Sequence, residues 1–157
     1  MDDVDGTFAA VENNVRSSLS STPADSFLWT ALYSVRTARY GFDERDIIFL
    51  RRSYIAGPHE GWISLGRNRL ALAIFQTLDS DMQRNVVAEF SEMADSGFVE
   101  EALDNLKGMG WAHRDLLLAS LASVDVGAKE EFARRLVSEG LDAQVPGVQI
   151  DERSWRR

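Results

Sequence analysis

The chain contains no cysteine and only two histidines. Without cysteine it can form no disulfide, thiolate nucleophile, zinc–thiolate site or iron–sulfur cluster. His59 and His113 have no acidic residue spaced to complete a ligand set such as His-Glu-x-x-His. We therefore expect surface or capping roles for both histidines and no metal site.

Positive charge is also scarce, because 17 basic residues stand against 25 acidic ones and give a formal net charge of −8. A field of that sign disfavours nucleic acids and anionic membrane surfaces, which bind positive charge. Residues 1–6 are acidic and hold no apolar run, so they do not form a secretory signal. The longest nearly apolar run, residues 70–75, is far shorter than the roughly 20 residues of a membrane-spanning helix. We predict no direct membrane insertion and a cytoplasmic protein as written, with a periplasmic position open if Met1 is an internal start.

Apolar residues make up 45% of the 157 residues, which is enough for one folded domain. Apolar side chains recur at steps of three and four through most of the chain, which is the helical period. The pattern predicts an all-α protein of about eight helices with no strand. We expect these helices at about residues 4–19, 24–40, 43–56, 59–77, 79–95, 98–107, 111–123 and 126–139.

Polar caps and helix breakers set most of these limits. Thr22 is the expected N-cap of the second helix, with Pro23 at the first helical position, where its missing N–H leaves no lost hydrogen bond. Asp43 is the expected N-cap of one later helix, and either Asp79 or Ser80 is the expected N-cap of another. The expected breaks are Gly41, Gly57-Pro58, Ser96-Gly97, Gly108-Met-Gly110 and Gly140.

Two tryptophan-centred phrases, Trp29-Thr-Ala-Leu-Tyr33 and Trp62-Ile-Ser-Leu-Gly66, lie 33 residues apart. A period near 34 residues is typical of stacked helical hairpins. The second phrase resembles the opening Trp-x-x-Leu-Gly of the tetratricopeptide repeat, and Phe49 and Pro58 fall close to that pattern's later aromatic and closing proline. The expected glycine is Tyr33 in the first copy, and neither copy keeps the expected tyrosine.

The tetratricopeptide resemblance implies antiparallel hairpins stacked as a short right-handed α-solenoid. We expect repeat-like hairpins at about 23–57 and 58–96 within a single domain of residues 1–140, followed by an extended C-terminal tail, 141–157, that could pack across a groove. Trp29, Trp62 and Trp111 fall on apolar helical stripes, which favours core positions. Trp155 is expected to be a loosely packed anchor in the tail.

Three further stretches, residues 23–29, 50–54 and 57–62, are similar to bacterial helical-repeat proteins linked to cell-surface polysaccharide production. That resemblance implies a membrane-anchoring segment ahead of the repeats. The sequence as written shows none.

No catalytic signature is present. The serines lie in no Gly-x-Ser-x-Gly elbow, and Gly108-Met-Gly110 lacks the further glycine, lysine or strand that binds phosphate. The adjacent acids Glu100-Glu101 and Glu130-Glu131 point about 100° apart on a helix and cannot converge on one bond. We predict no catalytic residue and no cofactor, and therefore not an enzyme.

Residues 28–75 form a basic island, with seven arginines against four acids. In tetratricopeptide domains the groove often binds an extended peptide through cationic side chains, and arginine pairs with carboxylates in a bidentate fashion. Arg67 is expected to face the groove. The alternative is that the arginines pair with acids of this chain such as Asp43, Asp46 and Glu60. The candidate partner-binding residues are Arg36, Arg51, Arg52, Arg67 and Arg69.

The sequence thus favours a non-enzymatic adaptor that binds a protein or peptide segment, acidic or C-terminal in character, in a helical-repeat groove. The alternative is an accessory or regulatory subunit of a bacterial cell-envelope polysaccharide or secretion system. In that case the acidic second half and the 145–150 segment form the protein interface. A third class, an enzyme acting on a small molecule between helices, has only the possibility of a pocket in its favour.

Overall fold

The computed structural model describes residues 2–150, and all regular secondary structure within them is helical. The predictions of an all-α protein and of eight helices are confirmed for this part of the chain. None of the helices in residues 2–150 is both long and apolar enough to cross a membrane. The α-helices are α1 (Asp2–Ser21), α2 (Ser26–Tyr40), α3 (Ile47–Ala56), α4 (Gly61–Ala73), α5 (Ser80–Asp95), α6 (Val99–Lys107), α7 (Arg114–Ser120) and α8 (Val126–Ser138), with 3₁₀ turns η1 (Glu44–Asp46), η2 (Phe75–Thr77), η3 (Trp111–His113) and η4 (Leu121–Ser123).

Local capping chemistry sets the helix ends. The Asp79 carboxylate accepts a hydrogen bond from the Met82 N–H at 2.9 Å, as predicted. Asp43 caps a 3₁₀ turn that leads into α3, and Gly41 ends α2 with a φ of +79°. The expected start of α2 was wrong by two residues. Asp25 is its N-cap because the Asp25 side chain, closer to the helix than Thr22, accepts from the Leu28 N–H.

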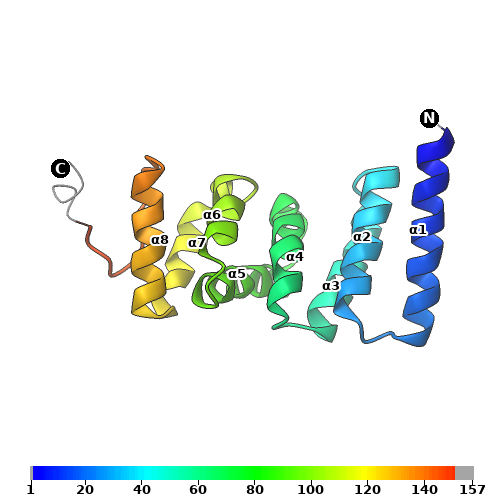
Figure 1. Cartoon of the computed structure of the whole chain (residues 1–157), viewed down its shortest axis with the longest axis horizontal. Helices are drawn as coiled ribbons and strands as arrows, with labels where there is room; N and C mark the ends of the chain where they lie inside the picture. The colour runs from blue at the N-terminus through cyan, green and yellow to red at the C-terminus, as the bar shows by residue number, and fades with distance from the viewer. Residues whose placement is uncertain (1, 151–157) are drawn as a thin grey trace.

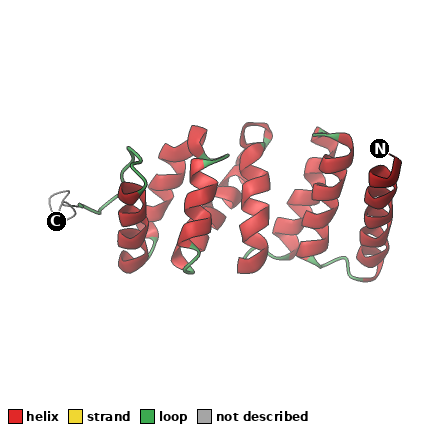
Figure 2. Ribbon diagram, turned by 45° about the horizontal axis from the view of Figure 1, so that its top comes forward, coloured by secondary structure: helices red, strands yellow, loops and turns green. Residues whose placement is uncertain are grey.

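The helices follow one another along the long axis of the molecule, from α1 at one end to α8 at the other (Figure 1). The first turns of α2 and α4 meet through the rings of Phe27 and Trp62, whose centroids are 5.3 Å apart. Gly61 at the start of α4 faces Phe98, the residue before α6. The helices α2, α4 and α6 therefore run in the same direction, and the intervening helices return the chain. The turned view in Figure 2 shows the same row of helices joined by short loops.

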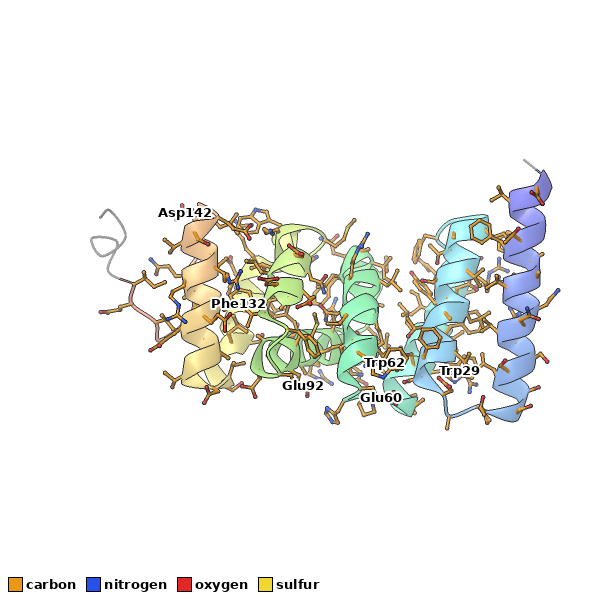
Figure 3. All side chains as sticks on the ribbon, viewed as in Figure 1. Trp29, Glu60, Trp62, Glu92, Phe132 and Asp142 are labelled. Atoms are coloured by element: carbon orange, nitrogen blue, oxygen red, sulfur yellow. The ribbon has the colours of Figure 1, made fainter. Side chains whose placement is uncertain are left out.

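One hydrophobic core runs through most of the row, from Tyr33 on α2 to Val145 beyond α8. Phe90 of α5 and Phe132 of α8 meet edge to face inside it, at 5.9 Å between ring centroids, and Figure 3 labels Phe132 on α8. A smaller cluster of Leu19, Leu32 and Val35 joins α1 to α2. α1 is thus joined to the row through α2, by this cluster and by ion pairs of Asp5 and Glu12, and most of the remaining helices share one core.

Burial recurs along the chain with a constant spacing. The least buried stripe of α2 consists of Phe27, Ala31, Ser34 and Ala38, which follow one another at steps of four, three and four residues. A shift of 35 residues gives an exposed stripe with the same steps on α4: Trp62, Gly66, Arg69 and Ala73. A second shift of 35 residues gives a third exposed stripe on and around α6: Gly97, Glu101, Asp104 and Gly108. On the returning helices, buried Leu50, Ser53 and Tyr54 of α3 match buried Val86, Glu89 and Phe90 of α5, which lie 36 residues later. The capping residues Asp43 and Asp79 are also 36 residues apart.

Several apolar residues that fit the helical spacing in the sequence are exposed in the structure. Val4 and Val11 lie on α1, which contacts a helix on one side only, and Ile55 lies at the exposed end of α3. The sequence predicts an extended, packed C-terminal tail, and residues 141–150 are indeed without helix. Val145 is buried against the core, and Ile150 packs against the same core. The tail residues 141–150 pack against the core next to α8. Trp155 lies outside the described residues.

Candidate interaction surface

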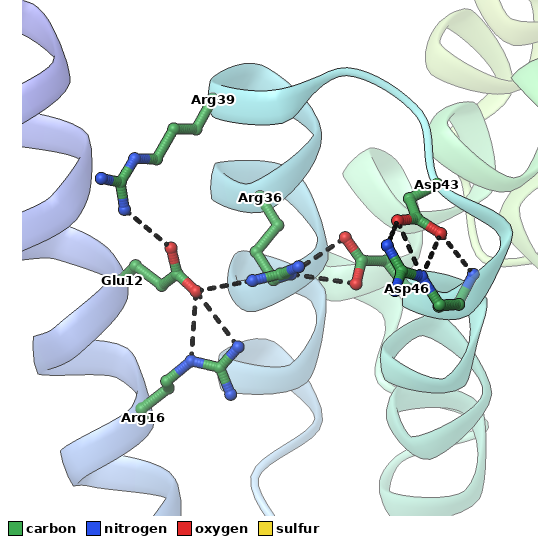
Figure 4. Close-up of polar contacts among 7 residues, drawn as sticks. Glu12, Arg16, Arg36, Arg39, Asp43 and Asp46 are labelled. Atoms are coloured by element: carbon green, nitrogen blue, oxygen red, sulfur yellow. Dashed lines mark hydrogen bonds and ion pairs between the residues drawn. The ribbon is translucent and has the colours of Figure 1, made fainter.

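Arg36, one of the predicted partner-binding arginines, is occupied by acids of this chain. Its guanidinium donates to both carboxylate oxygens of Asp46 at 2.9 Å and to Glu12 at 2.9 Å (Figure 4). Glu12 also accepts from Arg16 and Arg39, so one carboxylate of α1 ties α1 to α2. Burial raises the pKa of Glu12, but the hydrogen bonds from Arg36 and Arg16 outweigh it and lower the pKa below its usual value.

Arg51 and Arg52, on α3, point to different neighbours. Arg51 forms an ion pair with Asp79 at the start of α5. The Arg52 guanidinium carbon lies over the Trp29 ring, 5.1 Å from its centroid, in a cation–π arrangement. Trp29 is half-buried and stacks on Phe49, so Arg52 helps to cover the α2–α3 contact. Neither arginine lines a shared groove with Arg36.

Arg67 does not face a groove, and the expectation that it would is wrong. Its side chain is 0% exposed and forms an ion pair with Glu89 of α5, which is 1% exposed, at 2.6 Å between Nη2 and Oε1. Arg67 Nε also donates to Glu89 Oε1 at 2.8 Å. The exposed residue of this region is Arg69, and residues two apart on a helix point about 200° apart. The sequence register therefore placed the wrong arginine outward.

Arg67 and Glu89 belong to a buried polar network that joins four helices. Arg67 Nη1 donates to the Ser53 carbonyl at 3.0 Å, and the Tyr54 hydroxyl donates to Glu89 Oε2 at 2.6 Å. Burial raises the pKa of Glu89 against the lowering by Arg67 and Tyr54, and burial also raises the pKa of Tyr54 well above its usual value. The network continues through Asn68, whose Oδ1 accepts from Asn105 Nδ2 of α6 at 3.2 Å.

Trp62 was expected in the core and is 61% exposed. It lies at the beginning of α4 (Figure 3), and Phe27, which is 46% exposed, is the second residue of α2. Trp29 is half-buried and Trp62 is exposed, so the two tryptophans lie at different depths. The next turn of each helix differs in the same way, because a shift of 33 residues pairs buried Tyr33 with exposed Gly66. The shift of 35 residues found in the burial pattern pairs Trp62 with Phe27 instead.

The least buried stripes of α2, α4 and α6 define a surface that we name the even-helix face, in which Ala31 and Ser34 are half-buried and the other residues are exposed. It consists of Phe27, Ala31, Ser34 and Ala38, then Trp62, Gly66, Arg69 and Ala73, then Gly97, Glu101, Asp104 and Gly108. Seven of these twelve residues are glycine, alanine or serine. An added Cβ at Gly66 meets no atom within 4 Å, so the middle of this surface is open. The face combines an aromatic pair, seven small residues and three charged side chains.

A pocket of about 390 Å³ lies at the charged side of the even-helix face, between α4 and α6. Arg69 and Leu65 of α4 line one wall, and Glu101, Asp104 and Asn105 of α6 line the other. Arg69 forms no ion pair with any described residue, since it takes part in none of the ion pairs within residues 2–150. Of the five candidate arginines, Arg69 is the one that the structure places at a pocket on this face.

Residues 2–150 hold no group of three or more metal-ligating side chains. His59 is exposed beside Glu92, and His113 packs against the ring of Phe75 at 4.5 Å between ring centroids.

Sequence reasoning missed Phe27, Glu101, Asp104 and Asn105 as members of one surface. The signal that could have found them is the recurring step pattern of four, three and four at intervals of 35 residues, which was hidden by the more conspicuous tryptophan spacing of 33.

Comparison of the chain with family models, with curated proteins and with solved structures gave no significant match.

Proposed function

We propose that this chain is a short helical-repeat protein of the tetratricopeptide-like type, a right-handed α-solenoid of the hairpins α2–α3, α4–α5 and α6–α7 closed by α1 and α8. The 35-residue recurrence of the exposed stripes and the 36-residue recurrence of the capping aspartates support this proposal. Hairpins of this length bury their apolar faces by stacking on their neighbours. The sequence-derived boundaries of 23–57 and 58–96 enclose the first two hairpins.

In function, we propose a non-enzymatic interaction module that binds a segment of a partner protein along the even-helix face. The observation that carries this proposal is the exposed Phe27–Trp62 pair beside a floor of small residues. Large aromatic side chains are favoured as anchors in protein interfaces. Small residues let the backbone of a partner approach the helices closely.

The size of the face suits a short extended segment. Packed helices lie about 8–10 Å apart, so three neighbouring stripes span about 20 Å. An extended chain covers that distance with about six residues at about 3.3 Å each. The aromatic pair and the pocket would then contact residues about three positions apart in the same segment.

A peptide-display experiment tests the proposal. A library of random peptides about ten residues long, longer than the expected contact, is selected on the full chain. Selected peptides are then measured for affinity to wild type, to Trp62→Ala and to Arg69→Glu. We expect at least tenfold weaker binding to both variants, since each removes a central contact of about 1.4 kcal/mol or more.

Matched controls separate loss of the face from a general effect. Phe42→Ala removes an exposed aromatic in the α2–α3 connection, and Arg84→Glu reverses an exposed charge on α5. Neither residue belongs to the even-helix face, so both variants should bind like wild type. A library without enriched binders, or binders that tolerate both face variants, contradicts the proposed function.

A further inference from the structure

The pocket between α4 and α6 contains an acceptor atom that the protein leaves unused. Asn105 is 6% exposed and donates its Nδ2 to Asn68 Oδ1 at 3.2 Å. Asn68 in turn donates to the Val86 carbonyl at 3.0 Å, which fixes the orientation of both amides. No hydrogen bond among the described residues uses Asn105 Oδ1. Among the described residues, the side-chain polar atoms that lack both a hydrogen bond and contact with solvent belong to Ser26, Thr37 and Arg67. Asn105 Oδ1 is not among them, so it is accessible, and we infer that it is accessible from the pocket that Asn105 lines.

Carboxylates stand beside this acceptor. Glu101 lines the pocket and forms no ion pair with any described residue, while Asp104 has one at 3.1 Å with Lys107. The α6 wall therefore presents only acceptors: one amide oxygen held in place by the buried network and two carboxylates. With Arg69 on the opposite α4 wall, the charged lining residues are one base and two acids, of which Asp104 is shared with Lys107 and Glu101 is unpaired among the described residues.

The basic island does not offset this charge, because most of its arginines are neutralised within the chain. Arg36 pairs with Glu12 and Asp46, and Arg67 pairs with Glu89. Arg39, Arg45 and Arg51 have their own acids, so five of the island's seven arginines are paired. The expectation of an acidic partner came from these charges together with the tetratricopeptide resemblance. Because most of the arginines pair within the chain, the acceptors that line the pocket are the better guide to the charge of the partner.

We propose that the α4–α6 pocket binds the ammonium or guanidinium group of a lysine or arginine side chain in the partner segment. This inference rests on the proposed function and names the chemistry of the partner. The cation donates to Asn105 Oδ1 and to the carboxylates of Glu101 and Asp104, which are charge-assisted hydrogen bonds. Arg69 donates to a backbone carbonyl of the same segment from the facing wall. An apolar residue about three positions away rests on the Phe27–Trp62 pair.

The test uses the ¹⁵N-labelled full chain and two small probes, Nα-acetyl-lysine amide and Nα-acetyl-glutamine amide. The reporters are the Asn105 side-chain amide and the Gly108 backbone amide, which adjoin the pocket. We expect the lysine probe to shift both signals and to bind about tenfold more tightly than the glutamine probe, since only lysine offers a charged donor. Equal responses to the two probes overturn the inference.

Two variants test whether the preference for the lysine probe arises in the pocket. Glu101→Gln combined with Asp104→Asn removes both charges without changing shape, and should abolish the preference for lysine. Glu100→Gln is the matched control, because Glu100 pairs with Arg135 of α8 and does not line the pocket. A lysine preference that survives the double variant, or that Glu100→Gln also removes, overturns the inference.

The peptide library separates the two proposals. Enriched peptides that carry no excess of lysine or arginine contradict the pocket chemistry and leave the interaction module standing. A lysine-specific response together with an absence of enriched peptides contradicts the interaction module and leaves the pocket chemistry standing.

Discussion

Replacing Glu89 by glutamine should strongly destabilise this protein. Glutamine keeps the shape of the side chain and can still accept from the Tyr54 hydroxyl, but it removes the charge that faces Arg67. The guanidinium is then left as an uncompensated cation, with a side chain 0% exposed and the Ser53 oxygens as its remaining acceptors. Removing one partner of a buried ion pair costs about 3–5 kcal/mol.

For a chain of this length each kcal/mol shifts the melting temperature by about 2–4 °C, so Glu89→Gln should melt about 6–20 °C below wild type. The measurement is thermal and urea denaturation followed by circular dichroism, made at pH 8 to keep the wild-type carboxyl ionised. Arg135→Gln is the matched control, because the Arg135–Glu100 pair is exposed and such pairs contribute about 0–1 kcal/mol.

The double variant Arg67→Met with Glu89→Gln refines the prediction. Methionine removes the stranded charge and fills much of the same volume, so the double variant should regain at least half of the stability lost in Glu89→Gln. The reasoning is refuted if Glu89→Gln loses less than about 1 kcal/mol, the range of an exposed pair. It is also refuted if the double variant is less stable than the single one.

Three further predictions concern single sites. Gly110→Ala should cost about 1–3 kcal/mol in chemical denaturation, because its Cβ would lie 2.9 Å from a backbone carbonyl oxygen, whereas Gly66→Ala on the open side of α4 should gain about 0.5–1 kcal/mol; equal effects would contradict the packing at Gly110. The ionised Glu12 carboxylate should stabilise the fold above pH 4.5, and this contribution should be lost as the pH falls through the lowered pKa of the folded state. The unfolding free energy of Glu12→Gln should therefore fall less steeply in acid than that of wild type, and parallel pH profiles of the two proteins would contradict this. The Asp43 carboxyl should titrate with a pKa of about 2 by carboxyl NMR, because the side-chain and backbone N–H groups of Arg45 donate to the carboxylate. The pKa of Asp43 should rise toward 3.8 in Arg45→Gln, and a pKa unchanged by that substitution would show that the pair does not form in solution.

The helix limits were predictable from sequence because they depend on short-range chemistry. Asp79 caps α5 through a residue three positions away, and Gly41 ends α2 by adopting a φ of +79°. Thr22 failed because two capping residues, Thr22 and Asp25, lie within one turn of each other, and the aspartate nearer the helix makes the hydrogen bond. Such competition is local, yet the sequence does not rank the two candidates.

The depth of individual side chains was less predictable, because it depends on which helices surround each face. Trp62 and Ile55 fit apolar stripes in the sequence, but no helix covers them. Arg67 and Glu89 look like ordinary surface residues in the sequence, and they are buried because the two meet between α4 and α5. Their pairing over 22 residues is a tertiary event that no helical period encodes.

The most direct test of the account is to map where a selected peptide binds. Amide chemical-shift changes are measured on the ¹⁵N-labelled full chain as an enriched library peptide is added. We predict that the changes concentrate on the even-helix face, along α2, α4 and α6, with the largest near Trp62 and Gly108. Changes that concentrate instead on α3, α5 and α7 would contradict the account.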